Sequence, residues 1–143
     1  MSGILRRMPL RLTLPVALCA AAFATAASAS APLPRLLDCG GKPLLRPAGI
    51  VVLACADGNS ELRSTRWTSW TGAGAVGVTD LGLNLCDPNC ASSRMRFFPH
   101  SRVRLSDLKR TKLGRLFTRV SVTYVMHGKT RTFVGYPPTS RHA

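Results

Sequence analysis

The chain has 143 residues, of which 20 are basic and six are acidic, so its formal net charge is +14; 45% of its residues are hydrophobic. This length allows one domain with a hydrophobic core and argues against a multidomain protein. Beyond the first 30 residues the longest apolar run, Ala48 to Ala56, has nine residues, which is too short to span a bilayer.

The first 29 residues are typical of a secretory signal peptide. Three arginines without an acidic neighbour precede an apolar stretch of small residues from Leu12 to Ala27, and Ala27-Ser28-Ala29 supplies a small-x-small cleavage site. We therefore expect cleavage after Ala29, a mature chain that starts at Ser30, and a secreted or cell-envelope location on the extracellular side. The three arginines are Arg6, Arg7 and Arg11.

Other interpretations of this segment stay open. Leu12 to Ala27 could act as an uncleaved anchor, although it is short and consists mostly of alanine. Ala24-Thr25-Ala26 offers a second cleavage site, Arg6-Arg7 resembles a twin-arginine signal, and Cys19 lies in a sequence that faintly resembles a lipoprotein box.

The remaining chain divides by composition. Residues 30–47 are rich in proline, glycine and leucine and predict an extended lead-in with turns. Residues 48–136 alternate strand-like segments with turns and predict a β domain, and residues 137–143 follow Pro137-Pro138 as a loose tail.

The strand pattern predicts an all-β, mainly antiparallel fold, either a small β-sandwich or a barrel-like domain. Residues 116–126 alternate most clearly, and Asp57-Gly58-Asn59 and His127-Gly128-Lys129 are turn signals. Residues 106–113 predict one or two helical turns, with Ser106 as the cap and Gly114 as the stop. The predicted strands are 49–56, 62–71, 72–85, 94–98, 102–106, 116–126 and 130–136.

Four cysteines remain after cleavage: Cys39, Cys55, Cys86 and Cys90. An even count in an exported chain favours two disulfides, for which three pairings exist. Asp87-Pro88-Asn89 is a strong turn former and brings Cys86 near Cys90, which leaves Cys39 for Cys55. The competing interpretation is a zinc site that uses Cys86, Cys90 and His100.

We expect no enzyme, cofactor or metal site, because each motif has a simpler explanation. Residues 72–77 match G-x-G-x-x-G, but no helical pattern follows and no acid lies 20 residues on. Asp57, Asn59 and Glu61 alternate like calcium ligands but lack the glycine that such a loop requires. No nucleophile motif accompanies the three histidines, which are His100, His127 and His142.

Trp67 and Trp70 are three positions apart and are therefore expected on opposite faces of a strand. We expect one indole in the core. The other either lies on the surface, where it could stack on a sugar or base, or is buried as well.

Basic residues concentrate in the C-terminal half. Cleavage would remove three of the 20 basic residues and no acid, leaving 17 − 6 = +11, and residues 94–141 hold twelve Lys and Arg against Asp107 alone. Residues i and i+2 of a strand share a face, so neighbouring strands could form one cationic surface. The candidate anion-binding residues are Arg94, Arg96, Arg102, Arg104, Arg119, Lys129 and Arg131.

Such a surface should attract wall phosphate, acidic lipid or nucleic acid without reading sequence. Arginine suits this role because its fork can hold phosphate oxygens in a bidentate manner. The alternative is a solvated face without a ligand, since arginine outnumbers lysine 16 to 4 and a GC-rich genome produces that bias.

One combination of motifs resembles a family of small secreted actinobacterial proteins with four mature cysteines and no established activity. It comprises Cys39, residues 53–59, Trp67-Thr68-Ser69-Trp70, residues 84–91 and residues 117–124. The resemblance implies export and a compact four-cysteine domain, and it carries over no catalytic residue.

The sequence thus predicts a monomeric, non-catalytic binding module for anionic polymers of the envelope or medium. The alternative is a secreted protease inhibitor, in which the turn between Cys86 and Cys90 would be a disulfide-braced reactive loop.

Overall fold

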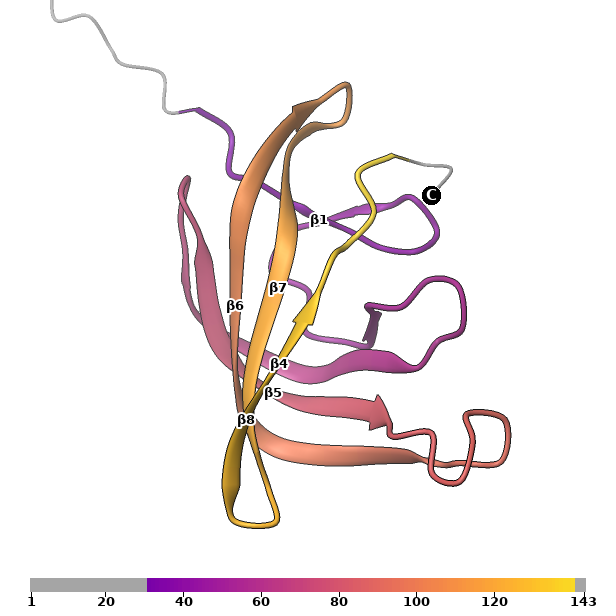
Figure 1. Cartoon of the computed structure of the whole chain (residues 1–143). Helices are drawn as coiled ribbons and strands as arrows, with labels where there is room; N and C mark the ends of the chain where they lie inside the picture. The colour runs from indigo at the N-terminus through magenta and orange to yellow at the C-terminus, as the bar shows by residue number, and fades with distance from the viewer. Residues whose placement is uncertain (1–30, 141–143) are drawn as a thin grey trace, which may run out of the picture.

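The computed structural model describes residues 31–140, which contain eight strands and no helix (Figure 1). The predicted signal peptide lies outside the described residues, as do the expected new terminus Ser30 and the tail residues 141–143. The strands are β1 (Leu36–Leu37), β2 (Pro43–Leu44), β3 (Val51–Val52), β4 (Ser60–Trp70), β5 (Ala75–Asn84), β6 (Met95–Thr111), β7 (Gly114–Met126) and β8 (Lys129–Gly135).

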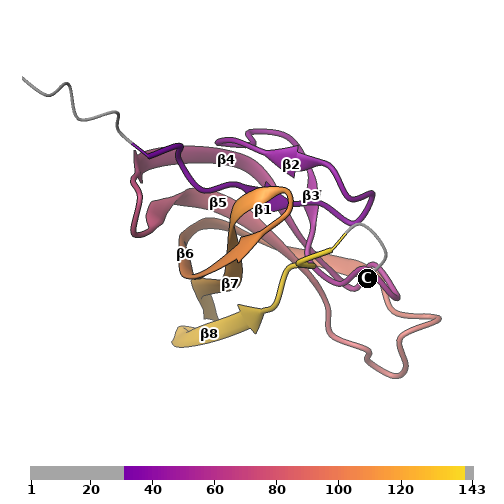
Figure 2. The same cartoon turned by 90° about the horizontal axis from the view of Figure 1, so that it is seen from above.

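Six strands form one antiparallel sheet in the order β3-β4-β5-β6-β7-β8, and β1 pairs with β2 in a second, two-stranded sheet. The large sheet curls into a half-barrel, and the N-terminal segment with β1 and β2 lies across its concave side (Figures 1 and 2). The predicted all-β, antiparallel fold is confirmed.

Tight turns connect the longest strands. Gly114 has a φ of 100° where β6 turns into β7, and Thr111 Oγ1 accepts a hydrogen bond from the Leu113 amide in the same turn. His127 and Gly128, with φ of 51° and 72°, form the two-residue turn before β8. Positive φ at both central positions gives the turn the twist that antiparallel strands need, as the His-Gly-Lys signal predicted.

The predicted helical turns at 106–113 are wrong, because β6 continues through this segment to Thr111. Leu105 and Leu108 both face β7 residues of the core, opposite Val120 and Phe117. Asp107 lies between them with a φ of 54°. This local change in backbone conformation places Leu105 and Leu108, which are three residues apart, on the same face of the strand. Pairing with β7 thus produces a spacing of apolar residues that resembles a helix.

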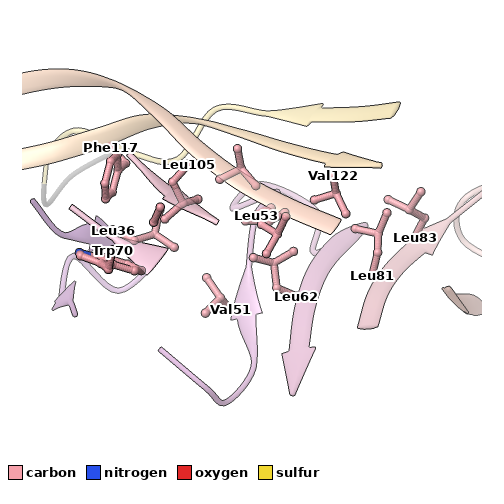
Figure 3. Close-up of a cluster of buried hydrophobic side chains, with 13 residues drawn as sticks. Leu36, Val51, Leu53, Leu62, Trp70, Leu81, Leu83, Leu105, Phe117 and Val122 are labelled. Carbon is pink, nitrogen blue, oxygen red and sulfur yellow. The ribbon is translucent and has the colours of Figure 1, made fainter. Parts of the chain in front are cut away.

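The core is a cluster of leucine, valine and aromatic side chains from every strand except β2 and β8 (Figure 3). Phe117 is fully buried, and its ring lies 5.4 Å from that of Trp70 in an edge-on arrangement. Leu53, Leu62 and Leu81 fill the other end (Figure 3). Their burial supplies the main stabilisation of a domain of this size.

The segment 31–47, which we expected to be an extended lead-in, is packed into the domain. Leu36 is fully buried in the core cluster. The backbone amide of Arg35 donates to Arg115 O, and its carbonyl accepts from the Phe117 amide, so the chain here extends the free edge of β7. Trp70 Nε1 donates to Pro34 O at 2.8 Å and fixes the segment from the other side.

Both tryptophans lie on the core side of β4, so the prediction of opposite faces is wrong. The pairing of β4 with β5 shifts register between Arg63 and Arg66 and again between Trp67 and Ser69. The two rings are 4.8 Å apart and perpendicular, and Trp67 Nε1 donates to Pro47 O. Neither indole is a free surface platform for a sugar or base.

Both predicted disulfides are confirmed. Cys39–Cys55 joins the segment after β1 to the loop after β3, with Cα atoms 5.2 Å apart. Cys86–Cys90 closes an exposed loop between β5 and β6, with Cα atoms 3.9 Å apart. Because both sulfurs of the second pair are in the bond, neither is a thiolate ligand for zinc.

Candidate anion-binding surface

The second half of β6 alternates between buried and exposed residues. Val103 and Leu105 are 2% and 0% exposed and face the core, whereas Arg102 and Arg104 are exposed on the other side of the sheet. Thr123 lies opposite Arg102 on β7, and Ser121 lies opposite Arg104. Two guanidinium groups and two hydroxyl groups therefore share the outer face of this strand pair.

A third arginine joins this face from β4. Arg66 lies opposite Val78 of β5, and Val78 lies opposite Arg102 of β6. Cross-strand partners point to the same side, so Arg66 and Arg102 flank β5 with Cα atoms roughly 10 Å apart at ordinary strand spacing.

A shallow hollow of about 430 Å³ lies on the outer face beside these residues. The Arg102 and Arg104 side chains line it together with the hydroxyl-bearing residues Thr68, Ser121 and Thr123. Val76 and Val78 form its apolar floor. The hollow thus combines cationic forks with neutral hydrogen-bonding groups, which is a suitable arrangement for oxygen atoms of an anion.

Arg119 also belongs to the outer face, since it lies opposite Ser106 on the same side as Arg104 and Ser121. Its Nη1 is 3.9 Å from Asp107 Oδ2, and both side chains are substantially exposed. An exposed pair at this distance contributes little to stability. We refer to Arg66, Arg102, Arg104 and Arg119 as the outer arginine face.

The remaining four predicted residues are not part of this face. Arg96 lies opposite the buried Leu83, on the core side at the open end of the sheet, and Arg94 precedes β6. Lys129 lies opposite Met126, and Arg131 lies opposite Tyr124, whose ring packs against the core. The seven residues therefore divide between the two sides of the sheet.

An irregularity in β6 separates Arg96 from Arg102 and Arg104. Leu81 lies opposite Phe98 and Thr79 lies opposite Ser101, so β6 has one residue more than β5 between these pairs. His100, with a φ of 56°, lies in this bulge. A single inserted residue exchanges the faces of all later residues, so the arginines before and after the bulge point in opposite directions.

Sequence reasoning missed Arg66 and the basic tip of the β6–β7 hairpin. The tip was interpreted as helical, although Thr111-Lys112-Leu113-Gly114 is a turn sequence between two strand-like segments. Arg66 was missed because its face depends on the register shift in β4. The basic residues of the tip are Lys109, Arg110, Lys112 and Arg115.

Acidic partners are scarce near these cations. Within residues 31–140 there are two salt bridges, one between Arg63 and Glu61 and the other between Arg119 and Asp107. Arg102 and Arg104 have no acidic partner in the described part of the chain. A polyanion that pairs with them would release counterions.

The other motifs give no site. Residues 72–77 form the loop between β4 and β5 and the start of β5, with no helix after them. Asp57 accepts from the Asn59 amide within a turn, and Glu61 is buried beside Arg63. His100 and His127 are exposed at positive φ, and His142 lies outside the described residues. Among residues 31–140 no cluster of metal-ligating side chains occurs.

The loop at Cys86–Cys90 is a tight turn. Asn84 caps it, because its Oδ1 accepts from the Cys86 amide and its Nδ2 donates to Cys90 O. A protease binds an extended segment of its inhibitor by strand addition, and a turn with ends 3.9 Å apart does not present one. Protease inhibition therefore stays a prediction without a site in the described residues.

The described residues contain no helix of sufficient length and hydropathy to cross a membrane. No family model, curated protein or solved structure matches this chain.

Proposed function

We propose that this protein is an exported, non-catalytic binding module that holds anionic polymers on the outer arginine face. Export is inferred from the N-terminal sequence, and the two disulfides are compatible with an oxidising extracellular compartment. The actinobacterial family resemblance supports the same location.

One observation carries the proposal. Arg102 and Arg104 project side by side into an open, hydroxyl-lined hollow, and neither has an acidic partner among the described residues. A structural arginine normally pairs with an acid, whereas these two are exposed and have no acidic partner among the described residues. Their guanidinium forks are free to bind phosphate oxygens, which favours a polymer with many such groups.

The test uses the chain from Ser30, which holds every described residue, and a fluorescein-labelled phosphate polymer followed by anisotropy. We expect binding at low salt that weakens steeply as salt rises, because each phosphate contact releases counterions. Arg102→Ser/Arg104→Ser should weaken binding roughly tenfold, the estimate for two lost contacts.

Lys129→Ser/Arg131→Ser is the matched control, since it removes the same charge from residues outside the outer arginine face. Thermal unfolding should show that both variants are folded. Absence of binding at low salt, or equal losses in the two variants, contradicts the proposal.

A further inference from the structure

We infer that the polymer is a single flexible phosphodiester chain that runs lengthwise along the β6–β7 hairpin, from Arg102 to the hairpin tip. This inference rests on the proposed function and specifies the ligand and its path. It follows from the order of the cations along the two strands and from the curvature of the sheet.

The cations form a track on the outer face. Arg102 and Arg104 begin it, Arg119 follows at the position opposite Ser106, and Lys109 comes next, itself exposed but opposite the fully buried Leu116. Lys109 points away from the core because its neighbour Leu108 packs against it. At ordinary strand rise, Arg102 and Lys109 are separated by about 23 Å along β6.

The hairpin tip concentrates positive charge at the far end of the track. Lys112 lies in the turn, and Arg110 lies directly opposite Arg115 across the strand pair. Like charges in this position are unfavourable to the sheet. Arg115 donates to Gly72 O. Arg110 is exposed on the opposite side of the hairpin from Lys109, and Lys112 is exposed in the turn. A polyanion at the tip would relieve the repulsion.

The shape of the sheet selects a flexible ligand. The half-barrel curls around its core, so the outer face that carries the track is convex (Figures 1 and 2). A DNA duplex is stiff over about 150 base pairs and touches a convex surface over a short length. A flat membrane meets it in the same way. A single chain can bend along the whole track and contact every cation.

The side chains of the track are suited to bind the phosphodiester groups of a polymer and not its other parts. Guanidinium and ammonium groups bind phosphate oxygens, and the hydroxyls of Ser121 and Thr123 can donate to them. Both tryptophans lie on the core side, and the exposed ring of Phe97, which lines a hollow with Arg102, is covered on one face by the Arg63 guanidinium 4.4 Å from its centroid. We therefore expect binding without preference among bases, and equal acceptance of a glycerol phosphate chain.

The first experiment compares ligands by anisotropy at one low salt concentration. The probes are labelled dT20, a 20-base-pair duplex, dT5 and a poly(glycerol phosphate) of similar charge number. We expect dT20 and the glycerol phosphate polymer to bind at least tenfold more tightly than dT5, and the duplex to bind more weakly than dT20. Similar binding of the two flexible probes would show that the track recognises phosphodiester groups alone, and a clear preference for dT20 would contradict this.

The second experiment compares two variants of equal charge, Arg102→Ser/Arg104→Ser and Lys109→Ser/Lys112→Ser. Each removes one end of the track and should weaken the binding of dT20 roughly tenfold. Both variants should change the affinity for dT5 by twofold or less, because a short probe can bind at the other end of the track. Circular dichroism melts confirm that both variants are folded.

The outcomes separate this inference from the proposed function. If the Lys109/Lys112 variant binds dT20 like the wild type while the Arg102/Arg104 variant is impaired, the track does not extend to the tip and the inference fails alone. Tighter binding of the duplex, or of anionic lipid vesicles, than of dT20 also overturns it. Failure of every probe to bind overturns the proposed function.

Discussion

Arg94 and Arg96, around the start of β6, have the same spacing as Arg102 and Arg104 in its second half, but the two pairs have different surroundings. In the first half, Arg96 lies opposite the buried Leu83 at the open end of the sheet. In the second half, Arg102 and Arg104 lie opposite Val78 and Val76 on the outer face. The bulge at His100 separates the halves and reverses the face.

This difference shows that position on one strand does not make residues part of one surface. Before the bulge, β6 pairs only with β5. Beyond the bulge it also pairs with β7 on its other edge, starting at Arg102 opposite Thr123 (Figure 1). Residues 102–105 therefore lie between two neighbouring strands, and their side chains alternate between the outer face and the core. Only this half combines a rigid frame with free cationic groups.

The largest expected effect is a difference in stability between substitutions on the two faces of the second half of β6. Leu105→Ala removes a fully buried side chain and should lower the free energy of unfolding by about 2–5 kcal/mol. Arg104→Ala, at the adjacent position, should change it by less than about 0.5 kcal/mol, because its side chain is exposed and without an acidic partner among the described residues. Guanidinium unfolding of both variants measures the contrast. Similar losses would show that Arg104 has a structural role.

The second prediction concerns the disulfides. Cys39→Ser/Cys55→Ser opens a loop with a sequence separation of 16 and should cost about 3 kcal/mol of stability. Cys86→Ser/Cys90→Ser opens a much shorter, exposed loop before the first half of β6 and should cost about 2 kcal/mol or less. Polymer binding should survive the second change. Loss of binding in that folded variant would place the ligand on the loop instead of the outer face.

The smallest expected effect is a gain in polymer affinity. Asp107→Asn removes the single acid beside Arg119 on the hairpin and should raise polymer affinity about threefold, the estimate for one more phosphate contact. Asp87→Asn is the matched control, because it makes the same charge change in the exposed loop after β5. Anisotropy titrations at one salt concentration compare them. An equal gain in both would indicate a net-charge effect without a local track.

Local signals predicted much of this fold. The turn at His127-Gly128 and the alternation of Val120 and Val122 with polar residues describe a hairpin that forms as expected. The cysteine pairing followed from the turn between Cys86 and Cys90. These features depend on neighbours in sequence, so the sequence alone contains the relevant information.

The errors arose where distant pairing decides the structure. The bulge at His100 lies where β6 pairs with β5, and the positive φ at Asp107 lies where β6 pairs with β7. No local pattern marks them, and each changes which side chains share a face. The lead-in could not be assigned to the core for the same reason, since Leu36 is buried against residues from the opposite end of the chain. The sequence therefore predicted that arginines form the candidate site, but not which arginines share one face of the sheet.

The central claim is that the outer face of the second half of β6 binds the polymer. Its most direct test compares Arg102→Ser/Arg104→Ser with Arg94→Ser/Arg96→Ser, which remove equal charge on either side of the bulge. The measurement is the dependence of dT20 affinity on salt, where each phosphate contact on a single strand contributes a slope of about −0.7. We predict that the first variant lowers the steepness by about 1.4 and the second leaves it unchanged. Equal changes in both variants, or a change in the second alone, would contradict the account.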